Sequence, residues 1–144
     1  MKAISTNIII NASAERVWSV LMNFPEYPHW NPFLVSVEGK VALGNRMKVK
    51  ARSSGANEMV FTPKITVYKE GRELQWSGHF LFPGLFDGRH VFRIVDNGDN
   101  TVTFIHEEIF TGILVSFYSN MLDDDTKEGY LRMNEKLKEI CESS

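Results

Sequence analysis

The stretch NMLDDDTKEGYLRMNEKLKEICE, residues 120–142, contains the strongest structural pattern of the sequence. Its apolar and small residues recur at intervals of three, four and one, the spacing of an amphipathic helix of about six turns. Asn120 is suited to cap the start of this helix. The helix dipole favours negative charge there, and residues 123–125 are acidic. Gly129 lowers helix stability, so its presence indicates a close approach by another element. One stripe is predicted to face a partner surface: Leu122, Thr126, Gly129, Tyr130, Met133, Leu137, Ile140 and Cys141.

Length and composition limit the classes of protein to which the chain can belong. Its 144 residues suit a single domain spanning 1–144. Sixteen basic and eighteen acidic residues give a net charge of −2, which argues against nucleic-acid binding. Cys141 is the only cysteine, which excludes an intrachain disulfide and a cysteine-rich zinc site. No apolar run approaches the ~20 residues of a membrane span, and no leader pattern is present, so we expect a cytoplasmic protein without stable membrane insertion.

The rest of the chain predicts one strand, two short helical pieces and then a run of strands. Residues 2–10 alternate as a strand, and Ser13 is placed to cap a helix from residue 14 to about residue 23. Pro25 and Pro28 restrict the next residues to a short helical turn or a compact loop. Turn residues separate six further candidate strands, at 33–38, 46–52, 59–69, 73–82, 88–96 and 101–111.

These elements predict an α+β fold with an antiparallel sheet. No connection between residues 33 and 111 is long enough for a crossover helix, so the strands should form a meander. We expect seven strands in one curved sheet wrapped around the long C-terminal helix, with two short helices after the first strand. A long twisted sheet curls, and the terminal helix is the element able to fill its concave side.

Three stretches carry a resemblance to a known superfamily. They are NASAERVW (11–18) with FPEYPHWNPF (24–33), LQWSG (74–78) with GLFDGRHVF (84–92), and TFIHEEIFTG (103–112). Together with the C-terminal helix they resemble the helix-grip superfamily of START, Bet v 1-like and polyketide cyclase/dehydrase proteins (SRPBCC), especially its small bacterial polyketide-cyclase-like members. The resemblance implies an elongated cavity between the sheet and the C-terminal helix, with Gly129 facing this void. It does not imply one function, because members of this superfamily differ in chemistry.

Three polar residues interrupt the apolar faces of the last two strands. Strand alternation places His90 on one face of its strand, and His106 and Glu108 on the matching face of the next. In one register His90 lies opposite Glu108, and in another it lies opposite His106. The patch could polarise a ligand carbonyl or act as an acid/base pair, so these three are the candidate catalytic residues. Alternatively, the three side chains only satisfy one another, and no metal site is expected because two adjacent strands do not converge on one point.

Aromatic and methionine side chains on the same faces are suited to line a pocket for a flexible or planar apolar ligand. A solid core with little void is the alternative. Trp30 either lies at the mouth of the cavity or packs the short helices against the sheet. The candidate ligand-binding residues are Trp30, Met59, Phe61, Trp76, Phe80, His90, Phe92, Phe104, His106, Glu108, Tyr130 and Met133.

The sequence therefore predicts a protein that binds a hydrophobic small molecule, such as a lipid or a polycyclic aromatic compound, as a monomer or a weak homodimer without a cofactor. One alternative is an enzyme similar to polyketide cyclases, aromatases or dehydratases, in which His90, His106 or Glu108 moves protons. Another is a protein-interaction module with an exposed apolar patch. The sequence leaves open whether there is turnover.

Overall fold

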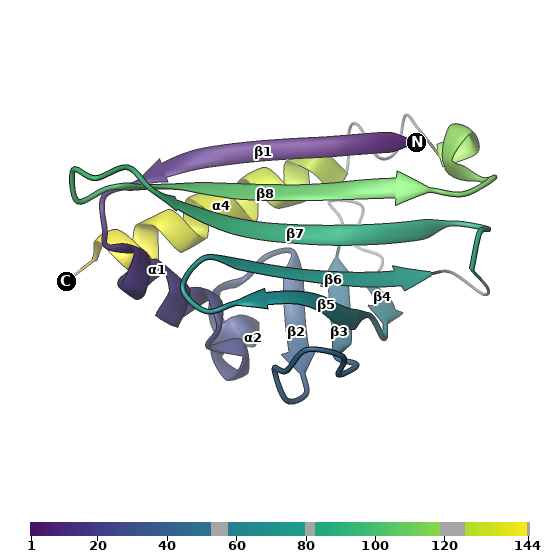
Figure 1. The fold of residues 1–144 in the computed structure, drawn as a ribbon, viewed down its shortest axis with the longest axis horizontal. Coiled ribbons are helices and arrows are strands. Elements are labelled where there is room, and N and C mark those ends of the chain that lie inside the picture. The colour runs from purple at the N-terminus through teal and green to yellow at the C-terminus, as the bar shows by residue number, and fades with distance from the viewer. Residues whose placement is uncertain (53–57, 80–82, 119–125, 144) are drawn as a thin grey trace.

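The computed structural model describes residues 1–52, 58–79, 83–118 and 126–143 (Figure 1). Its N-terminal half contains β1 (Lys2–Ile10), α1 (Ala14–Leu21), the 3-10 helix η1 (Phe24–Glu26), α2 (Tyr27–Trp30), β2 (Leu34–Glu38), β3 (Lys48–Arg52), β4 (Glu58–Phe61) and β5 (Lys64–Lys69). The second half contains β6 (Glu73–His79), β7 (Asp87–Asp96), β8 (Val102–Thr111), the 3-10 helix η2 (Val115–Tyr118) and α4 (Lys127–Glu142). The predicted order of strand, short helices, strands and terminal helix is confirmed.

The strands form two antiparallel sheets, not the single seven-stranded sheet that we predicted. Within the described ranges, one sheet has five strands in the order β1-β8-β7-β6-β5, and the other has three in the order β2-β3-β4. The predicted strand at 59–69 is interrupted by Thr62 and Pro63, which separate β4 from β5. Proline has no backbone N–H to donate to a ladder, so a continuous strand through residue 63 is disfavoured.

The two sheets remain linked beside this break. The backbone N–H of Met47 donates to the Pro63 carbonyl at 2.9 Å, and an isolated bridge pairs Arg46 with Lys64. The α+β class is therefore correct, and the error lies in the number of strands and their division between sheets.

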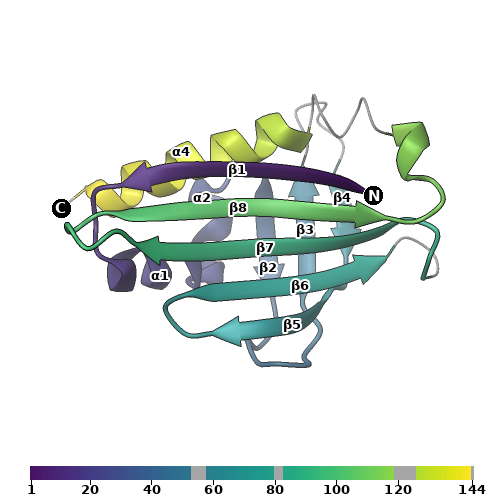
Figure 2. The same cartoon turned by 45° about the horizontal axis from the view of Figure 1, so that its top comes forward.

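The elements that cover the large sheet lie on one of its faces. In both views α4 runs alongside β1 and β8, while β2 and β3 cross the face farther along (Figures 1 and 2). Side chains from these elements join one buried cluster with those of the large sheet. At the beginning of α1, Ser13 Oγ accepts a hydrogen bond from the Arg16 backbone N–H at 3.1 Å, which confirms the predicted cap. No helix in the described part of the chain combines the length and apolar character needed to cross a membrane.

The C-terminal helix buries most of the predicted stripe, whereas Thr126 and Ile140 are only half-buried. Gly129, Tyr130, Met133, Leu137 and Cys141 are all buried in α4. The predicted start of the helix, including Asn120 as its cap and Leu122 on the stripe, lies outside the described residues. Asn134 is also buried and was not predicted to be.

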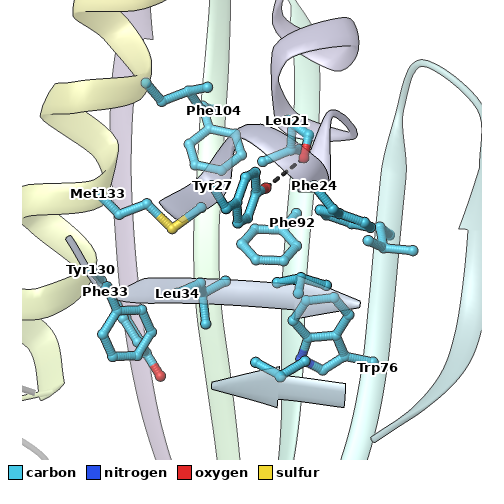
Figure 3. Close-up of a cluster of buried hydrophobic side chains, with 14 of the residues drawn as sticks. Leu21, Phe24, Tyr27, Phe33, Leu34, Trp76, Phe92, Phe104, Tyr130 and Met133 are labelled. Atoms are coloured by element: carbon cyan, nitrogen blue, oxygen red, sulfur yellow. Dashed lines mark hydrogen bonds between the residues drawn. The ribbon is translucent and has the colours of Figure 1, made fainter. Parts of the chain in front are cut away.

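The close approach expected at Gly129 is made by Phe33, which precedes β2. A Cβ atom built on Gly129 would lie 2.7 Å from Cδ1 of Phe33. The expectation that Gly129 faces a void is therefore wrong, because an aromatic ring occupies this space. Figure 3 shows Phe33 beside Tyr130, and their ring centroids are 4.9 Å apart.

Candidate functional site

The three predicted polar residues meet on the face of the large sheet that α4 covers. His90 lies directly opposite Glu108 in the β7–β8 pairing, which selects one of the two registers considered from the sequence. His90 Nδ1 lies 3.1 Å from Glu108 Oε1, and His90 Nε2 lies 2.7 Å from His106 Nε2. Direct and diagonal neighbours on one face of a sheet are close enough for such contacts. Strand alternation thus brings all three side chains into one hydrogen-bonded group.

Three further residues complete this group. The Tyr130 hydroxyl donates a hydrogen bond to Glu108 Oε1. On the other side, His106 Nδ1 lies 2.9 Å from Asn134 Oδ1, and Asn134 Nδ2 donates to Thr6 Oγ1 at 2.9 Å. A continuous polar chain therefore runs from Tyr130 on α4 through Glu108 on β8 to His90 on β7. It then returns through His106 on β8 to α4 and ends on β1.

Sequence reasoning missed the roles of Thr6 and Asn134. Alternation puts Thr6 on the same face of the first strand as Ile4 and Ile8, but nothing in the sequence links it to the histidines. Asn134 follows Met133 on the buried stripe of α4. A polar amide beside the apolar positions of a helix was the available signal, because buried amides require hydrogen-bond partners. We therefore name the set Thr6, His90, His106, Glu108, Tyr130 and Asn134 the polar chain.

Burial controls the protonation of two members of the polar chain. Desolvation and the nearby His90 hold the pKa of His106 well below 6.5, although its hydrogen bond to Asn134 opposes this shift. His106 is therefore neutral at pH 7. Burial, with a smaller contribution from Glu108, raises the pKa of Tyr130 well above 10, so this phenol keeps its proton and acts as a donor.

The depressed pKa of His106 predicts acid sensitivity. In the unfolded chain this imidazole titrates near 6.5, whereas the folded protein binds its proton only at lower pH. The stabilising effect is thus complete above the unfolded pKa and is lost as pH falls toward the folded pKa. In this window, each unit by which pH falls should lower the free energy of unfolding by about 1.4 kcal/mol because of His106.

Urea unfolding between pH 7 and pH 5 measures this effect. The neighbours His90, Glu108 and Tyr130 remain in the variant His106→Gln, which should show a shallower dependence on pH. The exposed residue His79 supplies the control, since His79→Gln should keep the wild-type slope. Equal slopes for wild type and His106→Gln would contradict the role of His106.

Glu108 is the member of the polar chain with access to solvent. Its side chain is 18% exposed, compared with 5% for His90. Both described partners, His90 and Tyr130, contact Oε1, so Oε2 has no partner among the described residues. Gly88, on β7, leaves room for this oxygen, since a Cβ atom at Gly88 would lie 2.5 Å from Oε2. Among the described residues, the carboxylate is thus held at Oε1 and has no partner at Oε2.

The small sheet provides an apolar wall that is incompletely covered. Met59 and Phe61 pair with Ala51 and Val49 of β3, so all four side chains share the inward face. Ala51 and Val49 are buried, whereas Met59 is 50% exposed and Phe61 is 38% exposed. In Figures 1 and 2, β4 and the beginning of α4 lie toward the same end of the molecule. Among the described residues, the inward face of β4 is therefore only partly covered.

Several other candidate ligand-binding residues belong to a packed core. Trp76, Phe92, Phe104 and Met133 are buried, and Figure 3 shows them within one cluster. Phe92 contacts both Trp76 and Phe104, with ring centroids 5.5 and 6.1 Å apart. This part of the structure agrees with the solid-core alternative. Phe80 lies outside the described residues.

Trp30 contributes to a different hollow on the surface. It is half-buried, contacts Tyr27 at a centroid distance of 5.1 Å, and borders a cleft of about 420 Å³. The lining residues of this outer cleft are Arg16, Ser19, Val20, Asn23, Glu26, Trp30 and Ile140. Trp30 is therefore separate from the polar chain. No group of three or more histidine, cysteine, aspartate or glutamate residues in the described ranges is arranged to hold a metal ion.

The fold and the covered polar face define an α+β protein whose antiparallel strands grip a C-terminal helix. The chain belongs to the family described as polyketide cyclase/dehydrase and lipid transport, whose model matches residues 1–142. The superfamily resemblance in the sequence is thereby confirmed. No curated protein matches the sequence.

Solved structures support the fold at low sequence identity. Hypothetical protein jhp0584 from Helicobacter pylori superposes with a TM-score of 0.79 and 10% identity, covering 97% of this chain and 88% of the other. Protein CV1439 from Chromobacterium violaceum gives a TM-score of 0.73 at 15% identity, with coverages of 99% and 98%. The di-domain ARO/CYC BexL from the BE-7585A biosynthetic pathway gives 0.75 at 11% identity, covering 99% of this chain and 50% of BexL.

Proposed function

We propose that the protein binds an apolar small molecule between the beginning of α4, the inward face of β4 and Glu108. The observation that carries this proposal is the Glu108 carboxylate, whose Oε1 is engaged and whose Oε2 has no partner among the described residues. Placing a carboxylate on a mainly apolar face is unfavourable unless partners hold it, and here His90 and Tyr130 do so. A mainly apolar surface with few fixed polar groups is typical of small-molecule sites.

The exposed wall of β4 supports the same location. Met59 and Phe61 are inward-facing side chains with large exposed fractions, and a ligand would remove their apolar surface from water. Phe33 and the aromatic cluster fill the space farther along the sheet, so the ligand would lie at the end near β4 and Tyr130. Membership of a family that includes lipid transport is consistent with such a ligand.

A second candidate function is acid/base catalysis of the kind suggested by the family description. The observation that favours it is the 3.1 Å contact between His90 Nδ1 and Glu108 Oε1, through which the two groups can share a proton. One structural neighbour, BexL, carries the designation ARO/CYC. In this function Glu108 would be the catalytic residue and His90 would hold the proton.

NMR titration tests the proposed site. Adding 2-naphthol to ¹⁵N-labelled protein should shift the backbone signals of Gly88, Glu108, Tyr130 and Phe61 with a common dissociation constant. Shifts confined to the outer cleft around Arg16 and Trp30, or no shifts at all, would contradict the proposal.

A matched pair of variants completes the test. Glu107 is adjacent in sequence, but alternation turns it to the other face, where it lies 3.6 Å from Arg93. Glu108→Gln should alter binding while Glu107→Gln should not. If a substrate is found, loss of turnover in Glu108→Gln with unchanged affinity would favour the enzyme.

A further inference from the structure

The hydrogen bonds at the far end of the polar chain fix the direction of every donor in it. Thr6 has a single hydroxyl proton, which it donates to the backbone carbonyl oxygen of His106 at 2.9 Å. Thr6 Oγ1 must therefore accept from Asn134, whose Nδ2 lies 2.9 Å away. This orients the amide so that Asn134 Oδ1 faces His106 as an acceptor.

The orientation of Asn134 assigns the tautomer of His106. Because Oδ1 of the amide only accepts, His106 Nδ1 carries the proton of their 2.9 Å hydrogen bond. His106 is buried and neutral, so its Nε2 carries a lone pair. The 2.7 Å contact between the two Nε2 atoms then requires that His90 donates.

Because the Nε2 proton of His90 is donated to His106, the nitrogen that His90 turns toward Glu108 is Nδ1. One proton must lie between Nδ1 and Oε1, since two lone pairs at 3.1 Å would repel. Tyr130 donates to the same oxygen, so two donors converge on Oε1, as is typical of a carboxylate paired with a protonated imidazole. Under this arrangement Oε2 of Glu108 carries no proton and has lone pairs to offer.

We infer that this site accepts a hydrogen bond, and that its ligands are apolar molecules carrying a hydroxyl group of the phenol, enol or alcohol class. The inference rests on the proposed function and specifies its ligand. A ligand carbonyl at Oε2 would bring two acceptors together, so a ketone or an ether is disfavoured. Asn134 and Thr6 are positioning residues, because they determine which way the protons point.

The Glu108 side chain is also partly exposed, at 18%. Among the described residues Oε2 has no hydrogen-bond partner, and Gly88 keeps the space beside it free of a side chain. A larger residue at position 88 would push the carboxylate away from its present place.

The test compares 2-naphthol with 2-methoxynaphthalene at neutral pH, using calorimetry on the full-length protein. The two probes share an aromatic frame, but only the naphthol can donate. A hydrogen bond to a charged acceptor predicts that the wild type binds the naphthol about tenfold or more tightly. In Glu108→Met, which removes the acceptor at similar volume, this preference should disappear.

The outcomes separate the two proposals. Equal affinities, or tighter binding of the ether, would overturn the acceptor inference while leaving the proposed function intact. If neither probe binds, both proposals fail. The comparison of the two probes on the wild type needs no variant. Gly88→Ala is a second variant: it should move the carboxylate without removing it and so weaken the preference for the naphthol.

Discussion

Replacing Phe33 with alanine is expected to lower the free energy of unfolding by about 3–5 kcal/mol, the usual cost of truncating a buried phenylalanine. Its ring is buried against Tyr130 and lies 6.4 Å, centroid to centroid, from both His90 and His106. Removing it deletes these contacts and leaves a cavity between α4 and the large sheet. Urea unfolding followed by circular dichroism measures the change.

A double-mutant cycle with Gly129 shows whether this contact is the cause. In the wild type, Gly129→Ala should destabilise by about 1–3 kcal/mol, because the new methyl group would overlap the Phe33 ring. In the Phe33→Ala background the overlap is absent, and the same change should stabilise by up to about 1 kcal/mol through helix propensity. If Gly129→Ala has the same effect in both backgrounds, Phe33 is not what requires glycine at this position.

Replacing Asn134 with leucine is expected to destabilise the protein nearly as strongly as Phe33→Ala. The change leaves His106 Nδ1 without an acceptor, at about 1–3 kcal/mol for an unsatisfied buried donor. It also removes the hydrogen bond that Thr6 Oγ1 accepts, worth about 0.5–1.5 kcal/mol, while Thr6 still donates to the His106 carbonyl. It also frees His106 to exchange its proton between the two ring nitrogens. ¹⁵N NMR of the imidazole nitrogens should show protonated Nδ1 in the wild type and a mixture of tautomers in the variant.

The neighbouring position supplies the control for Asn134. Glu135 is exposed on the same helix, so Glu135→Leu introduces the same side chain without touching the polar chain. It should change stability by less than about 0.5 kcal/mol and leave the imidazole signals unchanged. If the two leucine variants behave alike, the amide of Asn134 does not hold His106.

Features governed by local spacing could be predicted from the sequence. Strand alternation places His90, His106 and Glu108 on the same face of two neighbouring strands. The helical stripe predicts that Tyr130 and Met133 are buried. Both predictions depend only on the repeat of side-chain direction along a single strand or helix.

Features that depend on contacts between distant segments could not be predicted. The sequence predicts a strand that begins at Phe33, and nothing in its neighbourhood shows that Phe33 packs on Gly129, about a hundred positions later. Thr6 and Asn134 are 128 positions apart and meet only in the folded protein. Pro63 is visible in the sequence, but the predicted strand at 59–69 runs through it.

Native mass spectrometry of the freshly purified protein is the most direct measurement of whether it carries an apolar ligand. The proposed function predicts a mass above that of the chain alone, and denaturation should release an apolar molecule, which the acceptor at Glu108 requires to carry a hydroxyl group. A protein that carries no molecule and also fails to bind 2-naphthol at Glu108 would contradict the proposed function.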